Sequence, residues 1–310
     1  MNRLLVLGSV NADHVLRVPH FPRPGETLAG HSYRVVPGGK GANQAVAAAR
    51  LGAAVSFIAR IGDDAIGHQM KTGFAQDGID VSAVELDDTL PTGIAIIYVS
   101  DEGENSIGLS AEANGALTPA VVQGHEAMIA GAHTLLLQLE VPLESVFEAA
   151  RLATSHGTRV VLNPAPAQPL PAELLALVDL ITPNQTEAEL LTGVRVTDEA
   201  SARQAAARFH QMGIGEVMIT LGSQGVYCSK GQQQALIAGF RVEAVDTTAA
   251  GDTFNGALLA ADLAGASFQD AVRFAHGAAA LSVTRFGAQS SIPTRQEVDA
   301  FLLEQTAQGY

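Results

Sequence analysis

The sequence predicts an α/β protein with three layers, α/β/α, built on a mostly parallel β-sheet. Short apolar runs rich in β-branched residues alternate along the chain with longer stretches of helical periodicity. Such runs are typical of buried parallel strands, and their alternation with helices places helices on both faces of one sheet. With 310 residues, 47% of them hydrophobic, the chain is long enough to bury a large core.

The expected elements follow one another in this alternating order. Strands are predicted at 4–10, 55–61, 134–139, 159–162, 179–182 and 216–220, and helices at 41–51, 66–76, 143–156, 187–191 and 199–212. After Cys228 the pattern changes. Residues 235–242 resemble an antiparallel strand, and three consecutive helices are expected at 251–264, 268–284 and 294–305.

Two segments lack helical periodicity and carry alternating apolar residues instead. Residues 14–36 contain three prolines, and residues 93–100 and 105–109 flank a turn of Asp101-Glu102-Gly103-Glu104. Both segments follow main-sheet strands, at the edge of the sheet where ligands bind. We expect one small β-sheet from residues 13–37 and 93–111, standing off a main domain of residues 1–12, 38–92 and 112–310. Two ordinary surface hairpins are the alternative.

Composition excludes several classes of protein. Lys plus Arg number 18 against 32 Asp plus Glu, a net charge of −14, and no basic run occurs, so we expect no nucleic-acid partner. The only cysteine is Cys228, which excludes an intrachain disulfide and indicates a reducing compartment. No apolar run approaches the roughly 20 residues of a membrane span, and the N-terminal run is too short for a signal peptide. We therefore expect a cytoplasmic protein without a membrane partner.

The first motif is Gly38-Gly39-Lys40-Gly41-Ala42-Asn43-Gln44, which opens a predicted helix. Glycines let the backbone approach a ligand, and the start of a helix exposes unpaired N–H groups. The pattern is not a P-loop, because the lysine is followed by glycine. A plain turn is the alternative, but Lys40 and Asn43 stand one helical turn apart and can reach one polar ligand.

The second motif is the run 246–254, in which small residues precede an apolar helix with Asp252 in its first turn. Asp252 as a simple N-cap, worth about 1 kcal/mol, is the alternative. A cap of that kind is rarely preceded by a run of small residues and a second carboxylate, here Asp246. Amide donors beside a carboxylate suit phosphoryl transfer, because the donors stabilise the transferring group and the carboxylate takes a proton.

Three shorter motifs follow predicted strands. Asn184 and Glu187 lie on one helical face and offer oxygens to a hard cation, although a capping arrangement is favoured on this fragment alone. The segment 220–225 either seats a nucleotide phosphate or turns a hairpin. Asn11 and Asp13 follow the first strand, and alternation places them on the same side, where they can hold neighbouring hydroxyls.

Taken together and in this order, these segments resemble the ribokinase-type family of carbohydrate kinases over the whole chain. The resemblance covers residues 8–13, 24–27, 38–49, 62–64, 138–140, 163–166, 182–187 and 246–256. The pairing of Gly-Gly-Lys-Gly-Ala-Asn with Ala-Gly-Asp is highly specific for this family. It implies a ribokinase-like fold with the small sheet as a lid, and ATP-dependent phosphorylation of a sugar, D-ribose at O5.

The resemblance also implies a role for each matching position. Asp252 corresponds to the catalytic base, and the amides of Ala249, Ala250 and Gly251 to an anion hole, although the family more commonly has glycine at position 249. The sugar-binding positions are Asn11, Asp13, Gly39, Lys40, Gly41, Ala42, Asn43, Glu140 and Asp252. The ATP positions are Asn184, Thr220, Leu221, Gly222, Ser223, Gln224, Gly225, Gly251, Asp252 and His276. Asn184 and Glu187 match a motif that organises Mg²⁺ through water. A K⁺ site is implied at Asp246, Thr248, Ser282, Arg285, Gly287 and Ser291, where a mere turn over 285–291 is the alternative.

A homodimer through the lid is implied as well, and apolar lid strands such as 94–99 need a cover. The nearest rivals are kinases for a nucleoside, fructose or a sugar phosphate. The chain offers little aromatic stacking for a nucleoside and no basic residue near Asn11 besides Lys40. A dinucleotide-dependent dehydrogenase lacks support, because Gly8-Ser9-Val10-Asn11 is not a Gly-x-Gly-x-x-Gly turn. A non-catalytic sugar sensor is disfavoured by the intact Asp252.

Overall fold

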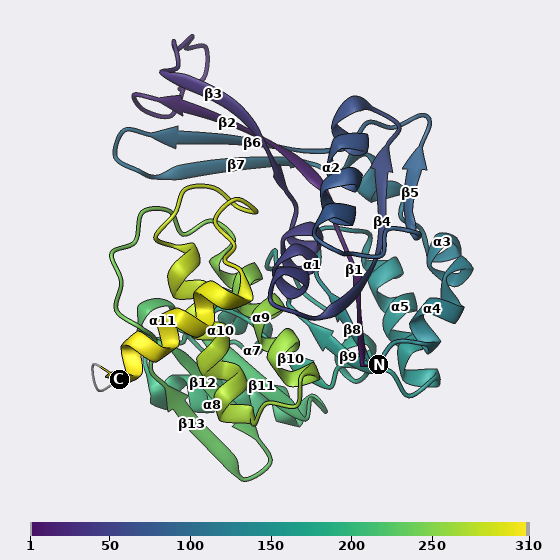
Figure 1. The fold of residues 1–310 in the computed structure, drawn as a ribbon, viewed down its shortest axis with the longest axis vertical. Helices are drawn as coiled ribbons and strands as arrows, with labels where there is room; N and C mark the ends of the chain where they lie inside the picture. The colour runs from purple at the N-terminus through teal and green to yellow at the C-terminus, as the bar shows by residue number, and fades with distance from the viewer. Residues whose placement is uncertain (1, 308–310) are drawn as a thin grey trace.

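A nine-stranded sheet forms the centre of the computed structural model, which describes residues 2–307 (Figure 1). Seven strands from β11 to β5 are parallel, and β12 and β13 extend the sheet antiparallel at one edge. The predicted mostly parallel sheet is confirmed. The strand order is β13 (Gln233–Ile237), β12 (Val226–Lys230), β11 (Glu216–Thr220), β10 (Leu180–Ile181), β9 (Arg159–Leu162), β8 (Thr134–Leu137), β1 (Arg3–Leu7), β4 (Ala54–Gly62) and β5 (Val84–Asp87).

Helices cover both faces of this sheet, so the predicted three layers are confirmed. Strand β1 shows why, because Leu4 and Val6 point into one apolar core while Leu5 and Leu7 point into the other. The first core lies under α1 (Lys40–Arg50), α2 (Ala65–Gln76), α9 (Ala250–Leu263), α10 (Phe268–Ser282) and α11 (Arg295–Ala307). The second lies under α3 (Pro119–Gly124), α4 (Glu126–Ala130), α5 (Leu143–Ser155), α6 (Ala172–Leu175), α7 (Gln185–Thr192) and α8 (Glu199–Gln211).

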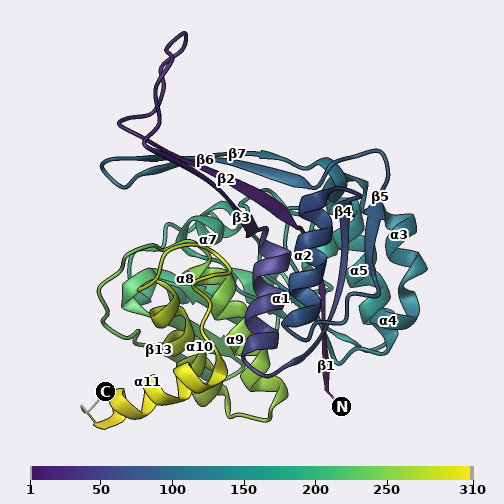
Figure 2. The same cartoon turned by 45° about the horizontal axis from the view of Figure 1, so that its top comes forward.

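A second, four-stranded sheet projects from the body of the molecule (Figures 1 and 2). Its order is β3 (Ser32–Gly38), β2 (Asn11–Val18), β6 (Gly93–Ser100) and β7 (Asn105–Ser110), and we call it the small sheet. Strands β2 and β6 pair in parallel, with Asn11 opposite Gly93. Because this pairing joins the two segments that lack helical periodicity, one sheet forms rather than two separate hairpins.

Element ends differ from the prediction where local contacts decide them. The first strand ends at Leu7 rather than at residue 10, because the chain leaves the main sheet there and enters β2 of the small sheet at Asn11. The edge strand β5 and the internal strand β12 were not predicted, since both are short and lack a clear alternation. The strand expected over 235–242 ends at Ile237.

Candidate active site

The predicted site residues gather at one edge of the main sheet. Strands β1, β8, β9, β10 and β11 are parallel and end at this edge, and α1 and α9 begin above it. The carboxyl edge of a parallel sheet is where α/β proteins bind ligands. Polar side chains that follow these strand ends are therefore placed to act together.

Glu140 holds the start of α1 against the end of β1. Its Oε2 accepts hydrogen bonds from Ser9 Oγ at 2.6 Å and from the Lys40 backbone amide at 2.9 Å. A carboxylate at this position satisfies a first-turn N–H group and complements the helix dipole. The preceding residue, Gly39, has φ of 91°, and a Cβ there would lie 2.8 Å from the Asn11 amide nitrogen. Only glycine fits this approach.

Asn11 is oriented by a residue that no sequence motif marks. Asn114, in the 3₁₀ helix η1 (Glu112–Ala116), is 1% exposed and donates from Nδ2 to Asn11 Oδ1 at 2.8 Å. It also bonds both backbone groups of Val10. The Asn11 amide nitrogen is thereby turned toward Glu140, whose Oε2 lies 3.5 Å away. Asn114 stands 103 positions from Asn11, so only the folded chain shows the contact.

The Asp13 carboxylate is buried without a protein donor. Its side chain lies on β2 and borders a cavity of about 520 Å³ between the small sheet and the segments 244–248 and 286–288. Among residues 2–307 no group donates a hydrogen bond to it, although the residue is only 8% exposed. Burial and the nearby carboxylates of Glu140 and Asp252 raise the pKa of Asp13 to about 7, while the Lys40 ammonium opposes the rise.

Asp252 lies in the first turn of α9 and is held by two amides of α1. Asn43 Nδ2 donates to its Oδ2 at 3.1 Å, and Gln44 Nε2 donates to its Oδ1 at 2.9 Å. The two helices approach closely because Gly256 has no side chain, and a Cβ there would lie 2.8 Å from the Gln44 carbonyl oxygen. The Asp252 carboxylate raises the pKa of Lys40, although no carboxylate within residues 2–307 lies within 4 Å of its ammonium.

The turn before α9 presents backbone N–H groups beside Asp252. Ala249 has φ of 59° and ψ of 13°, a left-handed conformation that explains why glycine is common here. The Ala250 amide donates to the Thr247 carbonyl at 3.3 Å. In the described part of the chain, the Ala249 and Gly251 amides have no protein acceptor. The turn therefore leaves two donors for an anion.

Asp246 joins the two segments predicted to hold a monovalent cation. Its Oδ1 accepts from the Thr248 amide and hydroxyl at 2.9 and 2.6 Å, and its Oδ2 accepts from the Gly287 amide at 2.9 Å. Burial raises the pKa of Asp246, but these hydrogen bonds outweigh burial and the net shift is downward. Ser282 ends α10, its carbonyl accepts from the Arg285 amide, and the Ser291 hydroxyl donates to a carbonyl in the same loop.

The predicted nucleotide positions on α7 and the β11–β12 turn form one group, and His276 on α10 lies apart from them. No hydrogen bond within residues 2–307 connects His276 to that group. Asn184 and Glu187 make a capping box at the start of α7, which is the arrangement that this fragment of the sequence favours when it is considered by itself. Burial raises the pKa of Glu187. The segment from Thr220 to Gly225 contains the 3₁₀ turn η2 (Gly222–Gln224) and turns the β11–β12 hairpin beside Asn184. His276, on α10, is buried, its ring packs edge-on against Phe254, and burial lowers its pKa to about 4.

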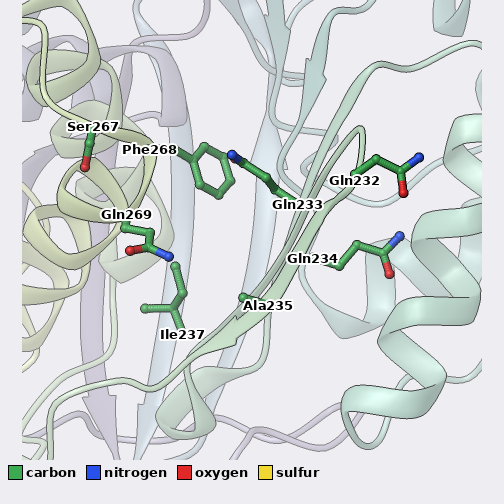
Figure 3. A pocket seen from close by; sticks show the side chains of 8 residues that line it. All are labelled: Gln232, Gln233, Gln234, Ala235, Ile237, Ser267, Phe268 and Gln269. Carbon is green, nitrogen blue, oxygen red and sulfur yellow. The ribbon is translucent and has the colours of Figure 1, made fainter.

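A second cavity, of about 480 Å³, lies away from these residues, between β13 and the start of α10 (Figure 3). Gln233 points toward Phe268 across it. It contains none of the predicted site residues. Residues 2–307 contain no cluster of three or more His, Cys, Asp or Glu side chains arranged to hold a metal ion. Within the same range, no helix is both long and apolar enough to cross a membrane.

The fold and this arrangement define an α/β phosphotransferase. A carboxylate stands beside free amide donors at a helix N-terminus, over the carboxyl edge of a parallel sheet, and a group of acceptors for hydroxyls lies next to it. Residues 1–295 match the pfkB family of carbohydrate kinases, and the chain belongs to that family.

Individual relatives are similar over nearly the whole chain. The chain is 58% identical to the ribokinase of Haemophilus influenzae over 299 residues, which is 96% of this chain and 98% of that protein. The structure of Arabidopsis thaliana ribokinase complexed with ribose and ATP superposes with a TM-score of 0.92 at 33% identity, covering 97% and 99% of the two chains. A deoxyribokinase of Salmonella typhimurium is 34% identical over 300 residues, covering 96% of this chain and 98% of that protein.

Proposed function

We propose that this protein transfers the γ-phosphoryl group of ATP to O5 of D-ribose. The observation that carries the proposal is the unpartnered Asp13 carboxylate, buried in one electrostatic cluster with Lys40 and Asp252. The carboxylate borders the cavity, so a ligand that fills the cavity must supply hydrogen-bond donors, such as hydroxyl groups, to this acceptor. Asn43 Oδ1 is a second buried acceptor without a protein donor, and it lies on the residue that contacts Asp252.

These groups suit a sugar with vicinal hydroxyls. Asn11 and Asp13 share one face of β2, so they bind the 2- and 3-hydroxyls of ribose together. The polar Asn11 favours ribose over a deoxy sugar, which lacks one of the two hydroxyls. Asn43 and Lys40 lie on the α1 side of the same cluster and bind the remaining oxygens.

Asp252 acts as the base of the transfer. It accepts the proton of the O5 hydroxyl as that oxygen bonds to the γ-phosphorus, and the bond from the γ-phosphorus to the bridging oxygen of ADP breaks. The free amides of Ala249 and Gly251 stabilise charge on the transferring oxygens. Catalysis then consists mainly of positioning and charge stabilisation.

Two cations complete the proposal. Asn184 and Glu187 fit a hydrated Mg²⁺, because each carboxylate oxygen of Glu187 accepts one hydrogen bond and keeps a lone pair for water. Mg²⁺ supplies neutralisation of phosphate charge. Asp246 fits a K⁺ site for the same reason, since Oδ2 accepts only the Gly287 amide and keeps a lone pair for an ion, and the Val283 carbonyl accepts from the Asp246 amide at 3.1 Å. An ion there stabilises the turn that carries the amide donors.

The small sheet provides a lid over the sugar and a dimer interface. It exposes Tyr33 at 61%, Ile107 at 55% and Leu109 at 52%, and isolated apolar strands of this kind need a partner. A second copy of the chain offers the same surface. The acidic composition leaves no nucleic-acid role, and the buried, single Cys228 suits a reducing cytoplasm.

A substrate panel tests the function. Ribose, 2-deoxyribose, fructose and adenosine are each incubated with Mg-ATP, with and without K⁺, and ADP release and the sugar phosphate are measured. We expect ribose to give the highest kcat/KM, a 5-phosphate product, and faster turnover with K⁺. A higher kcat/KM for any other acceptor contradicts the proposal.

A further inference from the structure

We propose that Gln44 is a positioning residue, which orients the Asp252 carboxylate through a buried chain of amides that begins at a backbone carbonyl. The inference rests on the proposed role of Asp252 as the base. Gln44 follows the sugar-binding Asn43 in the glycine-rich motif, but it faces away from the Asp13 cavity and is fully buried. Its side chain contacts Asp252, Asn163 and Gln138.

The direction of the chain is fixed at its start. A backbone carbonyl can only accept, so the Thr182 carbonyl requires Asn163 to present Nδ2, and the two groups lie 3.0 Å apart. Asn163 Oδ1 then faces Gln44 and accepts from its Nε2 at 2.9 Å. The second hydrogen of the same Nε2 reaches Asp252 Oδ1, also at 2.9 Å. A flipped Gln44 amide would place its oxygen against two acceptors at once.

Gln138 secures the opposite side of the Gln44 amide. Its Nε2 donates to Gln44 Oε1 at 2.7 Å, and Gln138 is fully buried. Gln44 therefore makes three hydrogen bonds in a site without exposure to water, and each of them specifies the same orientation. Thr182, Asn163 and Gln138 follow the ends of β10, β9 and β8, so the sheet itself sets the position of the amide that holds Asp252.

The consequence for the reaction is geometric. With Asn43 on Oδ2 and Gln44 on Oδ1, the carboxylate plane of Asp252 cannot rotate without losing a buried hydrogen bond. Each carboxylate oxygen then keeps one lone pair in a fixed direction, and one of these lone pairs accepts the proton of the acceptor hydroxyl. Displacement of a reacting group by about 1 Å costs up to about 100-fold in rate, which sets the size of the effect.

The test replaces Gln44 by a residue of similar length without a donor. For Gln44→Met, we expect kcat to fall by about 10–100-fold, while the KM values for ribose and ATP change less than about threefold. A loss confined to kcat is the readout that a merely structural role of Gln44 would not give, because a loosened site would also raise the KM values.

Gln138→Met tests the chain without touching Asp252. We expect a smaller fall in kcat, again with the KM values nearly unchanged, and no additional fall when it is combined with Gln44→Met, because its effect passes through Gln44. Thr158→Val is the matched control. It removes a buried hydroxyl that donates to the Ile129 carbonyl at 2.9 Å, remote from the site, and should lower the melting temperature without changing kcat or the KM values.

The outcomes separate the inference from the proposed function. If Asp252→Asn keeps wild-type turnover, the role of the base fails and the inference falls with it. If Asp252→Asn is inactive while Gln44→Met keeps wild-type kcat, only the positioning role is wrong. Additive losses in the double variant, or a rise in KM at constant kcat, also overturn it. Should Gln44→Met not fold, Gln138→Met decides alone: a lower kcat at nearly unchanged KM supports the chain, and an unchanged kcat refutes it.

Discussion

Asp13→Asn is expected to make the protein more stable and less able to bind its sugar. Asp13 has a pKa raised from 3.8 to about 7, because burial and the carboxylates of Glu140 and Asp252 disfavour its ionised form. The unfolded chain loses this proton near pH 3.8, whereas the folded chain keeps it until about pH 7. Between these values the folded state binds more protons, so its free energy of unfolding falls as the pH rises.

The size of the effect follows from the shift. A shift of about three pKa units, at about 1.4 kcal/mol each, lowers the free energy of unfolding of the wild type by about 4 kcal/mol at pH 8. About 1–2 kcal/mol of this loss has already occurred at pH 5. Asparagine does not ionise and avoids this cost. The free energy of unfolding of the Asp13→Asn protein should therefore exceed that of the wild type by up to about 4 kcal/mol at pH 8. At pH 5 this excess should be smaller by about 2–3 kcal/mol.

Urea unfolding at pH 5 and pH 8, followed by far-ultraviolet circular dichroism without sugar, measures this difference. The exposed Asp88 supplies the control, since Asp88→Asn removes a carboxylate that folding barely dehydrates. A stability difference for Asp13→Asn that is the same at both pH values would refute the reasoning. A variant less stable than the wild type at pH 8 would refute it as well. Isothermal titration of ribose should show weaker binding to the same variant.

Four further predictions concern the site and the small sheet. Asp252→Asn should lower kcat by about 10²–10⁴-fold and leave ribose affinity, measured by calorimetry, near wild type; near-normal turnover contradicts the base assignment. Ala249→Gly relieves the left-handed strain and should raise the free energy of unfolding by up to about 1 kcal/mol with kcat within about twofold, whereas Ala249→Val should lower both. Asp246→Asn should reduce the ratio of turnover in K⁺ to turnover in Na⁺, and an unchanged ratio contradicts the cation site. Ile107→Asp should give a monomer by light scattering if the small sheet forms the dimer, and a wild-type mass places the interface elsewhere.

Local sequence patterns correctly predicted the helices and strands that have a clear periodicity within their own segment. Periodicity identified the parallel sheet and most long helices, and the segments without helical periodicity identified the small sheet. The strands β5, at one edge of the sheet, and β12, between β11 and β13, were not predicted, because strands of only four or five residues carry little alternation. The burial of His276 against Phe254 also depends on how α9 and α10 pack, which no single segment encodes.

The candidate site divides in the same way. Asn43 and Asp252 stand in recognisable motifs, and the structure brings them within 3.1 Å. The contacts of Asn114 with Asn11, and of Gln44 with Asp252, join residues 103 and 208 positions apart. They exist because η1 packs beneath the small sheet and because Gly256 lets α9 approach α1. Residues that orient other residues therefore become visible only in three dimensions.

The short connection from β1 to β2 has a consequence for protein engineering. Strand β1 ends at Leu7 inside the main sheet, between β8 and β4, and β2 begins at Asn11 in the small sheet, so a single stretch of backbone serves both sheets. Excision of the small sheet, the obvious route to a minimal catalytic fragment, would also delete Asn11 and Asp13. Miniaturisation of this scaffold must therefore shorten the distal hairpins and spare the three or four residues nearest the main sheet.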